Sequence, residues 1–402
     1  MHSFEDALRI VRDKLSAGKV APAKESLPLE QVYGRVLAED VWADRDYPPF
    51  HRATRDGYAL RSGDVRALPA GLQVRGEIRA GESFVGKVGP GECVRIMTGA
   101  PLPAGADAVV RLEHVRAWDS QVEVTREVGR WENVVSQGSE ATAGSVVLPA
   151  GRRLGAGEMG LLATVGWART PVFCQPTVAI LPTGDELVPV EQRPGNFQTR
   201  DSNSVLLAAQ VAAAGGIPRS LGIAPDQQDS LRRMIEEGST AELLLLSGGV
   251  SVGKYDLAKQ TLADLGAEFY IQGVAMRPGK PLVFGRLGRS FFFGLPGNPV
   301  SALVTFQLFA RPALAALSGA EFETPVFLRA RLARPYRQSL GLTIVLPAKV
   351  GMLDSDPVVE PVGWQGSGDL VGLATANCFM VIHPQQTEIA AGTQVDILLK
   401  PA

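Results

Sequence analysis

The sequence has few of the residues that build disulfide frameworks and zinc centres. Among 402 residues there are three cysteines and four histidines, and no two cysteines have the C-x-x-C spacing of a zinc or redox motif. The H-E-x-x-H pattern of zinc proteases is absent as well. Sparse, unpaired cysteines are typical of a reducing compartment, so we expect a cytoplasmic protein.

A surplus of one charge and a long apolar run are also missing. The 40 basic and 42 acidic side chains give a formal net charge of −2, whereas nonspecific nucleic-acid binding needs a basic surplus. No apolar run approaches the roughly 20 residues of a membrane-spanning helix. Near the N-terminus, apolar residues recur at helical spacing with charges between them, which predicts an amphipathic helix rather than a signal peptide: Phe4, Leu8, Val11 and Leu15.

Glycine and proline are plentiful, at 44 and 28 residues, and they indicate many tight turns. The length predicts two to four domains. We expect residues 1–45 and 145–175 to pack together as an N-terminal domain, with a small β domain inserted at 46–144. An α/β domain is expected at 176–322 and a C-terminal β domain at 323–402.

Strand-like and helix-like segments alternate between residues 176 and 322. Thr177–Leu181 and the leucine run at 243–246 have the composition of buried strands. Residues 201–204 offer several helix caps, and Asp226 is expected to cap the next helix. This alternation predicts a three-layer α/β domain with a largely parallel sheet.

Three loops of this domain have the residues of an anion-binding site. The first follows the leucine strand and reads S-G-G-V-S-V-G, so that Ser247, Gly248, Gly249, Ser251 and Gly253 leave backbone N–H groups open. The second carries two cations, Arg277 and Lys280. The third opens a helix whose dipole favours anions, with Asn298 as the expected cap: Pro296, Gly297, Asn298 and Pro299. An ordinary turn or cap explains each loop taken singly.

Carboxylates gather at the same predicted sheet edge, at positions 185, 186, 201, 226 and 256. Each alone is more often a helix cap or a solvated acid than a ligand. Together they predict a Mg²⁺ site, because this ion prefers carboxylate oxygens combined with substrate phosphate and water. In the β domain, the turns around Asp56 and Thr98 also stand out, although generic turn chemistry explains either one.

Taken together, these motifs resemble those of the molybdopterin molybdenumtransferases, bacterial enzymes related to the E domain of gephyrin. The matching stretches follow the family's order over nearly the whole chain: P-P-F-H-R-A-T-R-D-G-Y-A (48–59), M-T-G-A-P (97–101), G-A-D-A-V-V (105–110), T-G-D-E-L (183–187), S-G-G-V-S-V-G (247–253), M-R-P-G-K-P (276–281), L-P-G-N-P (295–299) and Q-G-S-G (365–368).

The resemblance implies a homodimer of elongated, four-domain subunits that inserts molybdate into adenylated molybdopterin with magnesium and releases AMP. It places the pterin nucleotide on the three loops of the α/β domain. It also implies transient contact with the adenylyltransferase and with molybdoenzymes. The implied catalytic residues are Asp56, Thr98, Glu186, Asp226, Asp256 and Arg277, of which Glu186, Asp226 and Asp256 would hold the metal. Asp56 and Thr98 would reach the site from the partner subunit.

Four positions depart from the family pattern. Arg55 stands where Met is usual, His51 where Asp is usual, and Glu140 replaces an Asp. Val135 stands where the family has Arg, so a guanidinium that holds an anion is missing. We expect Arg55 to compensate for it.

Two other functions fit parts of the sequence. The related adenylyltransferase shares the S-G-G and P-G-N-P loops, but it consists of little beyond the α/β domain. A gephyrin-like scaffold or weakened paralogue would bind pterin or a partner protein without turnover, and Val135 favours that interpretation. The acids Glu186, Asp226 and Asp256 oppose it. The sequence does not distinguish molybdate from tungstate, since both are tetrahedral dianions of similar size.

Overall fold

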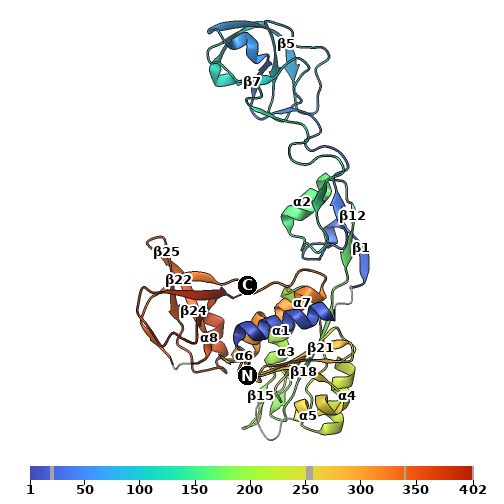
Figure 1. Ribbon diagram of the computed structural model, residues 1–402, viewed down its shortest axis with the longest axis vertical. Helices are drawn as coiled ribbons and strands as arrows, with labels where there is room; N and C mark the ends of the chain where they lie inside the picture. The colour runs from blue at the N-terminus through green and yellow to red at the C-terminus, as the bar shows by residue number, and fades with distance from the viewer. Residues whose placement is uncertain (19–21, 250–256, 339–340, 401–402) are drawn as a thin grey trace. The chain divides into compact units, whose positions relative to one another are not determined.

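The computed structural model describes residues 1–18, 22–249, 257–338 and 341–400. The chain divides into two compact units (Figure 1). Unit 1 contains Met1–Ala38, Gly151–Gly155 and Thr170–Ala402, and unit 2 contains Glu39–Ala150 and Ala156–Arg169. The four domain boundaries drawn from the sequence stay predictions.

The centre of unit 1 is a six-stranded sheet. In spatial order its strands are β16 (Ile217–Ser220), β13 (Thr177–Pro182), β17 (Leu243–Ser247), β21 (Ser290–Leu295), β20 (Val283–Leu287) and β18 (Glu268–Gln272). The first four strands are parallel, whereas β20 pairs antiparallel with both of its neighbours. Strands buried on both faces are continuous apolar runs, as in β17, where every side chain is buried.

Helices cover both faces of this sheet. Leu243 and Leu245 of β17 face the cluster that holds α3 (Asn203–Ala213), α6 (Pro299–Thr305) and α7 (Arg311–Leu317), the last two joined by a π-helical turn at Phe306–Ala310. Leu244 and Leu246 face the opposite cluster, which holds α4 (Gln228–Gly238) and α5 (Leu257–Asp264). The predicted three-layer α/β architecture with a largely parallel sheet is confirmed.

Two helices differ from the sequence-based expectation. The N-terminal helix α1 (Phe4–Ala17) buries Ala7, Val11 and Leu15 in the core of the α/β domain, so this segment packs within unit 1. Helix α4 begins at Gln228 with Gln227 at its N-cap, so the prediction that Asp226 caps it is wrong.

Contrary to the expectation from the sequence, one apolar helical stretch among the described residues is long enough by composition to cross a membrane. This stretch, Pro299–Leu317, is 78% buried. Its side chains form part of the core beneath the sheet. Burial within the protein therefore accounts for its apolar composition.

The C-terminal part of unit 1 is a second six-stranded sheet that closes through a β24–β26 pairing. Its order is β19 (Met276–Arg277), β24 (Thr343–Leu353), β25 (Asp356–Pro361), β22 (Leu328–Leu332), β28 (Gln394–Leu399) and β26 (Cys378–Ile382). Strand β19 comes from the α/β part and pairs parallel with β24. The other elements of unit 1 are the pairs β1 (Lys24–Pro28) with β12 (Arg169–Phe173), β14 (Leu187–Val188) with β15 (Thr199–Arg200) and β23 (Tyr336–Arg337) with β27 (Glu388–Ile389), the short helix α8 (Leu370–Thr375) and a 3₁₀ turn (Leu29–Gln31).

Unit 2 contains a third six-stranded sheet. Its order is β7 (Ala108–Arg111), β4 (Gly57–Leu60), β6 (Glu92–Ile96), β5 (Ala70–Ile78), β9 (Gln121–Val124) and β8 (Val115–Trp118). Two antiparallel ribbons and a helix complete the unit: β3 (Arg52–Ala53) with β10 (Val134–Val135), β2 (Val41–Trp42) with β11 (Val146–Leu148), and α2 (Ala156–Thr164), besides 3₁₀ turns at Ser62–Val65 and Leu112–His114.

Candidate functional site

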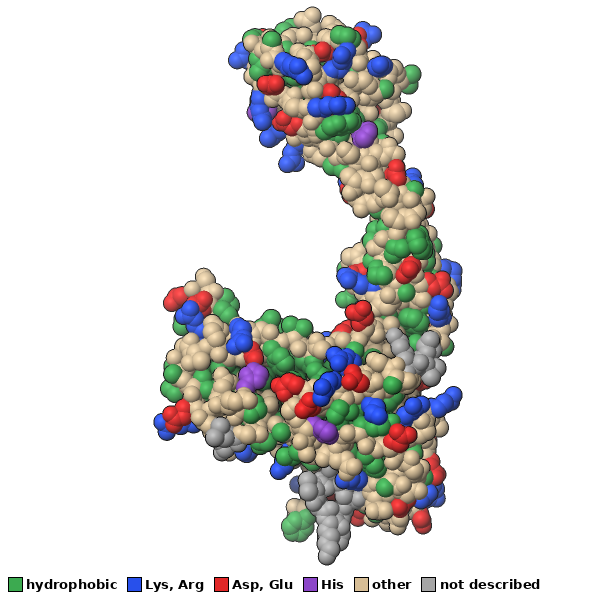
Figure 2. Space-filling model, in the orientation of Figure 1, with side chains coloured by type: hydrophobic (Ala, Val, Ile, Leu, Met, Phe, Trp, Pro, Cys, Tyr) green, Lys and Arg blue, Asp and Glu red, His purple; other side chains and the backbone are tan. Residues whose placement is uncertain are grey.

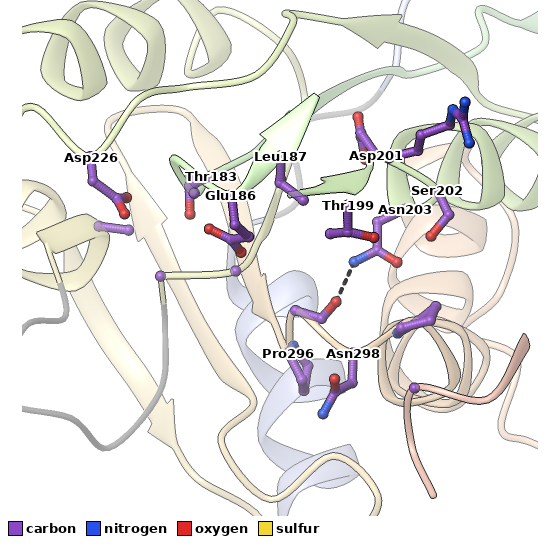
Figure 3. A pocket seen from close by; sticks show the side chains of 18 of the residues that line it. Thr183, Glu186, Leu187, Thr199, Asp201, Ser202, Asn203, Asp226, Pro296 and Asn298 are labelled. Carbon is purple, nitrogen blue, oxygen red and sulfur yellow. Dashed lines mark hydrogen bonds between the residues drawn. The ribbon is translucent and has the colours of Figure 1, made fainter. Parts of the chain in front are cut away.

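A cavity of about 660 Å³ lies where β13, β17 and β21 end. Ligands of open α/β sheets bind outside the carboxyl ends of the strands, so this is the expected place for a site. Loops that follow all three strands line it, together with the C-terminal β domain (Figure 3). Its described lining is Thr183, Gly184, Glu186, Leu187, Thr199, Arg200, Asp201, Ser202, Asn203, Asp226, Leu231, Gly248, Gly249, Leu257, Ala258, Pro281, Pro296, Gly297, Asn298, Pro299, Gly368 and Leu370.

Glycine is required where two of these loops approach each other. Gly248 has φ 92°, and a Cβ there would lie 2.5 Å from the Thr183 carbonyl oxygen. Gly249 has φ 63°, and its Cβ would lie 2.7 Å from the Thr183 hydroxyl. A side chain at either position is therefore strained and also blocks the cavity wall.

The side chain of Asn203, which the sequence analysis did not select, joins two of the loops. Its Nδ2 donates to Ser247 Oγ at 2.7 Å. It also donates to the Gly297 carbonyl at 2.7 Å, the bond drawn as a dashed line in Figure 3. Ser247 is buried, at 2% exposure. Because its hydroxyl accepts the hydrogen bond from Asn203, it helps to hold the two loops together. In the sequence, residues 201–204 indicate only helix caps, and that pattern gives no sign of this second role of Asn203.

Carboxylates occupy two sides of the cavity in Figure 3. Glu186 and Asp226 are exposed and lie on one side, whereas Asp201 is buried on the other. Asp201 Oδ1 accepts from the Ser204 backbone N–H at 3.0 Å, and Asp185 Oδ1 accepts from the Asp226 N–H at 3.0 Å. Asp185 therefore positions the backbone of Asp226.

The described lining of the cavity is acidic. It contains three carboxylates, at positions 186, 201 and 226, against the single cation Arg200. No group of three His, Cys, Asp or Glu side chains suited to a metal occurs in the part of the chain that the structure describes. The third predicted metal ligand, Asp256, lies outside the described residues, as do Ser251 and Gly253.

The predicted cations are not part of the described cavity wall. Arg277 and Lys280 are both exposed. Arg277 lies in β19, paired with the C-terminal sheet. Burial raises the pKa of nearby Tyr336, while Arg277 opposes that shift. Pro281, next to Lys280, does line the cavity.

The beginning of α6 is bound by the C-terminal domain. Asn298 Nδ2 donates to Ser367 Oγ at 2.9 Å, and the Val300 backbone N–H donates to the Ser367 carbonyl at 3.0 Å. Asn298 occupies the predicted N-cap position and Pro299 follows it as the first helical residue, but the Asn298 side chain makes no capping hydrogen bond to its own helix. Gly368 and Leu370 bring the same domain to the cavity wall.

The stretch Gly249–Gly253 also has the G-x-S-x-G spacing of serine-hydrolase nucleophile elbows. Such a serine needs a base within hydrogen-bond reach. The described lining of the cavity contains no histidine. Because Ser251 lies outside the described residues, the G-x-S-x-G spacing remains a match in sequence alone.

The two selected residues of unit 2 form one hydrogen-bonded pair. Asp56 Oδ1 accepts from Thr98 N at 2.7 Å and from Thr98 Oγ1 at 2.8 Å. These two bonds hold the pKa of Asp56 below its ordinary value, and the bond from the Thr98 backbone contributes most. Next in sequence, Gly57 leaves no room for a side chain, because a Cβ would lie 1.9 Å from the Val110 carbonyl oxygen. The loop therefore presents an ionised carboxylate from a rigid strand end.

The departures from the family pattern lie near this pair. Val135 is opposite Arg52 on the β3–β10 ribbon, and Arg52 pairs with Glu140 at 2.7 Å. Arg55 is exposed and donates to the Thr54 carbonyl at 3.4 Å. The guanidinium across from Val135 is thus that of Arg52, which the sequence analysis did not select.

Known proteins match this chain throughout its length. Three family models match it, described as "MoeA N-terminal region (domain I and II)" at residues 2–166, "Probable molybdopterin binding domain" at 179–316 and "MoeA C-terminal region (domain IV)" at 329–400. A Nostoc protein named molybdopterin molybdenumtransferase is 35% identical, covering 100% of this chain and 94% of the relative. The chain belongs to this family. A Staphylococcus aureus relative of the same name is 33% identical, over 93% of this chain and 90% of its own.

Solved structures agree with the family assignment. A crystal structure of a molybdopterin biosynthesis MoeA protein from Pyrococcus horikoshii is 32% identical with a TM-score of 0.74, covering 99% of this chain and 98% of that one. A second structure from the same organism is 28% identical with a TM-score of 0.81 over the full length of both chains. The resemblance drawn from the motifs is thereby confirmed.

Proposed function

We propose that this protein inserts molybdate into adenylated molybdopterin and releases AMP together with the molybdenum cofactor. Family membership makes it a transferase of molybdenum cofactor biosynthesis that acts on molybdopterin and molybdate. The observation that carries the finer proposal is the cavity at the sheet edge, where glycine loops and three carboxylates line one volume.

The glycine loop and the start of α6 are suited to orient the nucleotide. Gly248 and Gly249 expose backbone, and Gly297 lies close to them, with its Cβ position 3.5 Å from Gly248 Cα. Ser247 holds this arrangement through Asn203. We assign substrate binding to these loops, Ser251, Gly253, Lys280 and Pro296–Pro299, and assistance at the phosphates to Arg277.

Magnesium fits the donor set of the cavity. Glu186 and Asp226 supply exposed carboxylate oxygens, and Mg²⁺ binds one or two carboxylates together with substrate phosphates and water. A bound Mg²⁺ would neutralise phosphate charge as AMP leaves. The acidic lining supports this requirement, because three carboxylates against one arginine repel an unaccompanied polyphosphate. We assign Asp256 to the same set from the family pattern.

We further propose a homodimer in which Asp56 and Thr98 of one subunit complete the cavity of the other. Trp42 and Val146 are cross-strand partners on the β2–β11 ribbon, yet they are 52% and 42% exposed. Only Leu162 of the apolar helix α2 is buried, and apolar side chains gather on the surface around this helix (Figure 2). Exposed apolar surface of this kind is typical of a subunit interface.

The remaining assignments follow the same family. We propose a cytoplasmic location, which the three free cysteines support. We also propose transient contact with the adenylyltransferase that supplies the substrate and with the molybdoenzymes that accept the product. An adenylyltransferase would not need the regions at 2–166 and 329–400, so we do not propose that activity for this protein.

A turnover assay tests the reaction. Purified protein is mixed with adenylated molybdopterin, Mg²⁺ and molybdate, and AMP is measured by chromatography. We expect AMP release that requires both Mg²⁺ and molybdate. Glu186→Gln and Asp226→Asn should abolish AMP release while nucleotide binding persists. Tight binding without AMP release by the wild type would instead support a binding function.

A complementation assay tests the shared site. Asp56→Asn and Glu186→Gln should each be inactive as homodimers. Equal mixing with subunit exchange should restore about a quarter of wild-type activity, because half of the dimers are mixed and each has one intact site. If a verified heterodimer of the two variants shows no activity, all catalytic groups of a site belong to one subunit.

A further inference from the structure

Arg95 of unit 2 lies next to the Asp56 loop on the neighbouring strand. Strands β4 and β6 are antiparallel, and Tyr58 of β4 is opposite Arg95 of β6. Continued by two residues, this register places Asp56 opposite Met97 and diagonal to Arg95. Diagonal neighbours share one face of a sheet at about 7–8 Å, a distance that a long side chain spans. The guanidinium of Arg95 can therefore lie beside the Asp56 carboxylate.

The electrostatics of Asp56 agree with this placement. The two hydrogen bonds from Thr98 lower the pKa of Asp56 most, burial opposes them, and the positive charge of Arg95 lowers the pKa further. Such an effect requires a guanidinium near the carboxylate. Asp56, Thr98 and Arg95 are all exposed, so a ligand can reach them.

Both charged groups have hydrogen-bonding capacity left. Thr98 occupies Asp56 Oδ1, whereas no hydrogen bond to Asp56 Oδ2 occurs among the described residues. The Arg95 side chain likewise has no hydrogen bond or ion pair in the described part of the chain. Arg111 on the adjacent strand β7, by contrast, pairs with Glu113 at 2.9 Å. Asp56 and Arg95 thus offer an acceptor and a set of donors side by side.

The charges decide which ligand group suits this pair. The phosphates of the substrate and the molybdate ion are anions that only accept hydrogen bonds, so the ionised Asp56 carboxylate repels them. An N–H beside a carbonyl has the matching pattern, because the N–H can donate to Asp56 Oδ2 while the carbonyl accepts from Arg95. The aminopyrimidinone ring of a pterin has this pattern on one edge, whereas adenine has no carbonyl.

We propose that Asp56 and Arg95 recognise the edge of the substrate's pterin ring that carries an N–H next to a carbonyl. Arg95 is then a further substrate-binding residue, and Thr98 positions the carboxylate. This inference rests on the proposed function, in which the Asp56 loop completes a cavity. It adds which end of the substrate this loop meets, namely the pterin rather than the phosphates.

Unit 2 offers a matched pair of substitutions. Arg66 is also exposed and also has no side-chain partner among the described residues, but it follows the 3₁₀ turn Ser62–Val65 beyond the other end of β4. Arg95→Met and Arg66→Met each remove one exposed guanidinium and keep an apolar stem. Both variants should keep the wild-type melting temperature within about 2 °C, because isolated surface charges contribute little to stability.

Binding separates the two variants. By calorimetry with Mg²⁺ and without molybdate, we expect the Kd of Arg95→Met for adenylated molybdopterin to rise roughly tenfold or more, as for one hydrogen bond to a charged group. Arg66→Met should bind like the wild type. AMP lacks the pterin, so its Kd should be the same in all three proteins. Equal affinities of the two variants for adenylated molybdopterin would overturn the inference.

A turnover measurement tests the competing assignment of Arg95 to an oxyanion. If Arg95→Met raises only the molybdate concentration needed for half-maximal AMP release, Arg95 binds molybdate and the inference is wrong. Weaker binding of AMP would assign Arg95 to the phosphates and would also overturn it. A wild type that binds adenylated molybdopterin but releases no AMP would refute the proposed reaction, while the binding comparison would still decide this inference.

Discussion

Replacing Asn203 with alanine should separate the loops that form the cavity. The substitution deletes two hydrogen bonds, from Nδ2 to Ser247 Oγ and to the Gly297 carbonyl, both 2.7 Å long. These are the contacts that tie the ends of β17 and β21 to the start of α3. We therefore expect both lower stability of unit 1 and weaker binding of AMP with Mg²⁺.

The expected loss follows from what each partner retains. Two neutral hydrogen bonds contribute about 2 kcal/mol together. Ser247 is 2% exposed, so its hydroxyl stays buried and unpaired at a penalty of about 1 kcal/mol, whereas Gly297 is exposed and its carbonyl can turn to water. Asn203 Oδ1 is buried without a partner among the described residues, so its loss offsets part of this. The free energy of unfolding should fall by about 2–3 kcal/mol.

Urea unfolding followed by tryptophan fluorescence measures this loss in unit 1 alone. Of the five tryptophans, only Trp364 belongs to unit 1, so a background with phenylalanine at the other four positions reports on it. Asn377→Ala is the control. Asn377 also makes two hydrogen bonds, both to Val350, but in an exposed position, and its loss should stay near 1 kcal/mol or below.

The reasoning fails if Asn203→Ala destabilises unit 1 no more than Asn377→Ala does. A double-mutant cycle with Ser247→Ala gives a second check. The two substitutions share one hydrogen bond, so their combined effect should be smaller than the sum by about 0.5–1.5 kcal/mol. Strict additivity would show that the bond contributes nothing.

Two further predictions concern unit 2. Gly57→Ala should disrupt the β4–β7 pairing, because the added Cβ would lie 1.9 Å from the Val110 carbonyl oxygen. We expect a lower melting temperature of unit 2 and loss of turnover. Wild-type values for both would contradict this geometry. Thr98→Val should raise the pKa of Asp56 toward its ordinary 3.8, since one of its two donors is removed. The depressed pKa gives stability above 3.8 that is lost as the pH falls through the folded value. Carboxyl NMR titration measures the shift, and equal pKa values in both proteins would exclude a role for the hydroxyl.

Patterns that depend on neighbouring residues were predictable from the sequence. The leucine run at 243–246 identified β17, and Pro299 identified the start of α6. The hydrogen bonds of helix-capping residues were harder to predict, because a polar side chain at a helix end can also bind a residue far away in the sequence. Asn298 stands at the N-cap of α6, as predicted, but its side chain donates to Ser367, 69 residues away, rather than capping its own helix. Asp226 stands two residues before α4 and is held by Asp185 instead.

The amino-acid sequence by itself determined the family, the α/β architecture and the loops that meet at the sheet edge, since these depend on periodicity and on motifs in a fixed order. The tertiary structure decided which side chains act together. Asn203 joins β17 to β21 only because parallel strands end at one edge, and Arg52 rather than Arg55 lies opposite Val135 because register fixes cross-strand partners. Thr183 Oγ1 and Asn203 Oδ1 have no hydrogen-bond partner among the described residues, and a missing contact is visible only once all neighbours are in place.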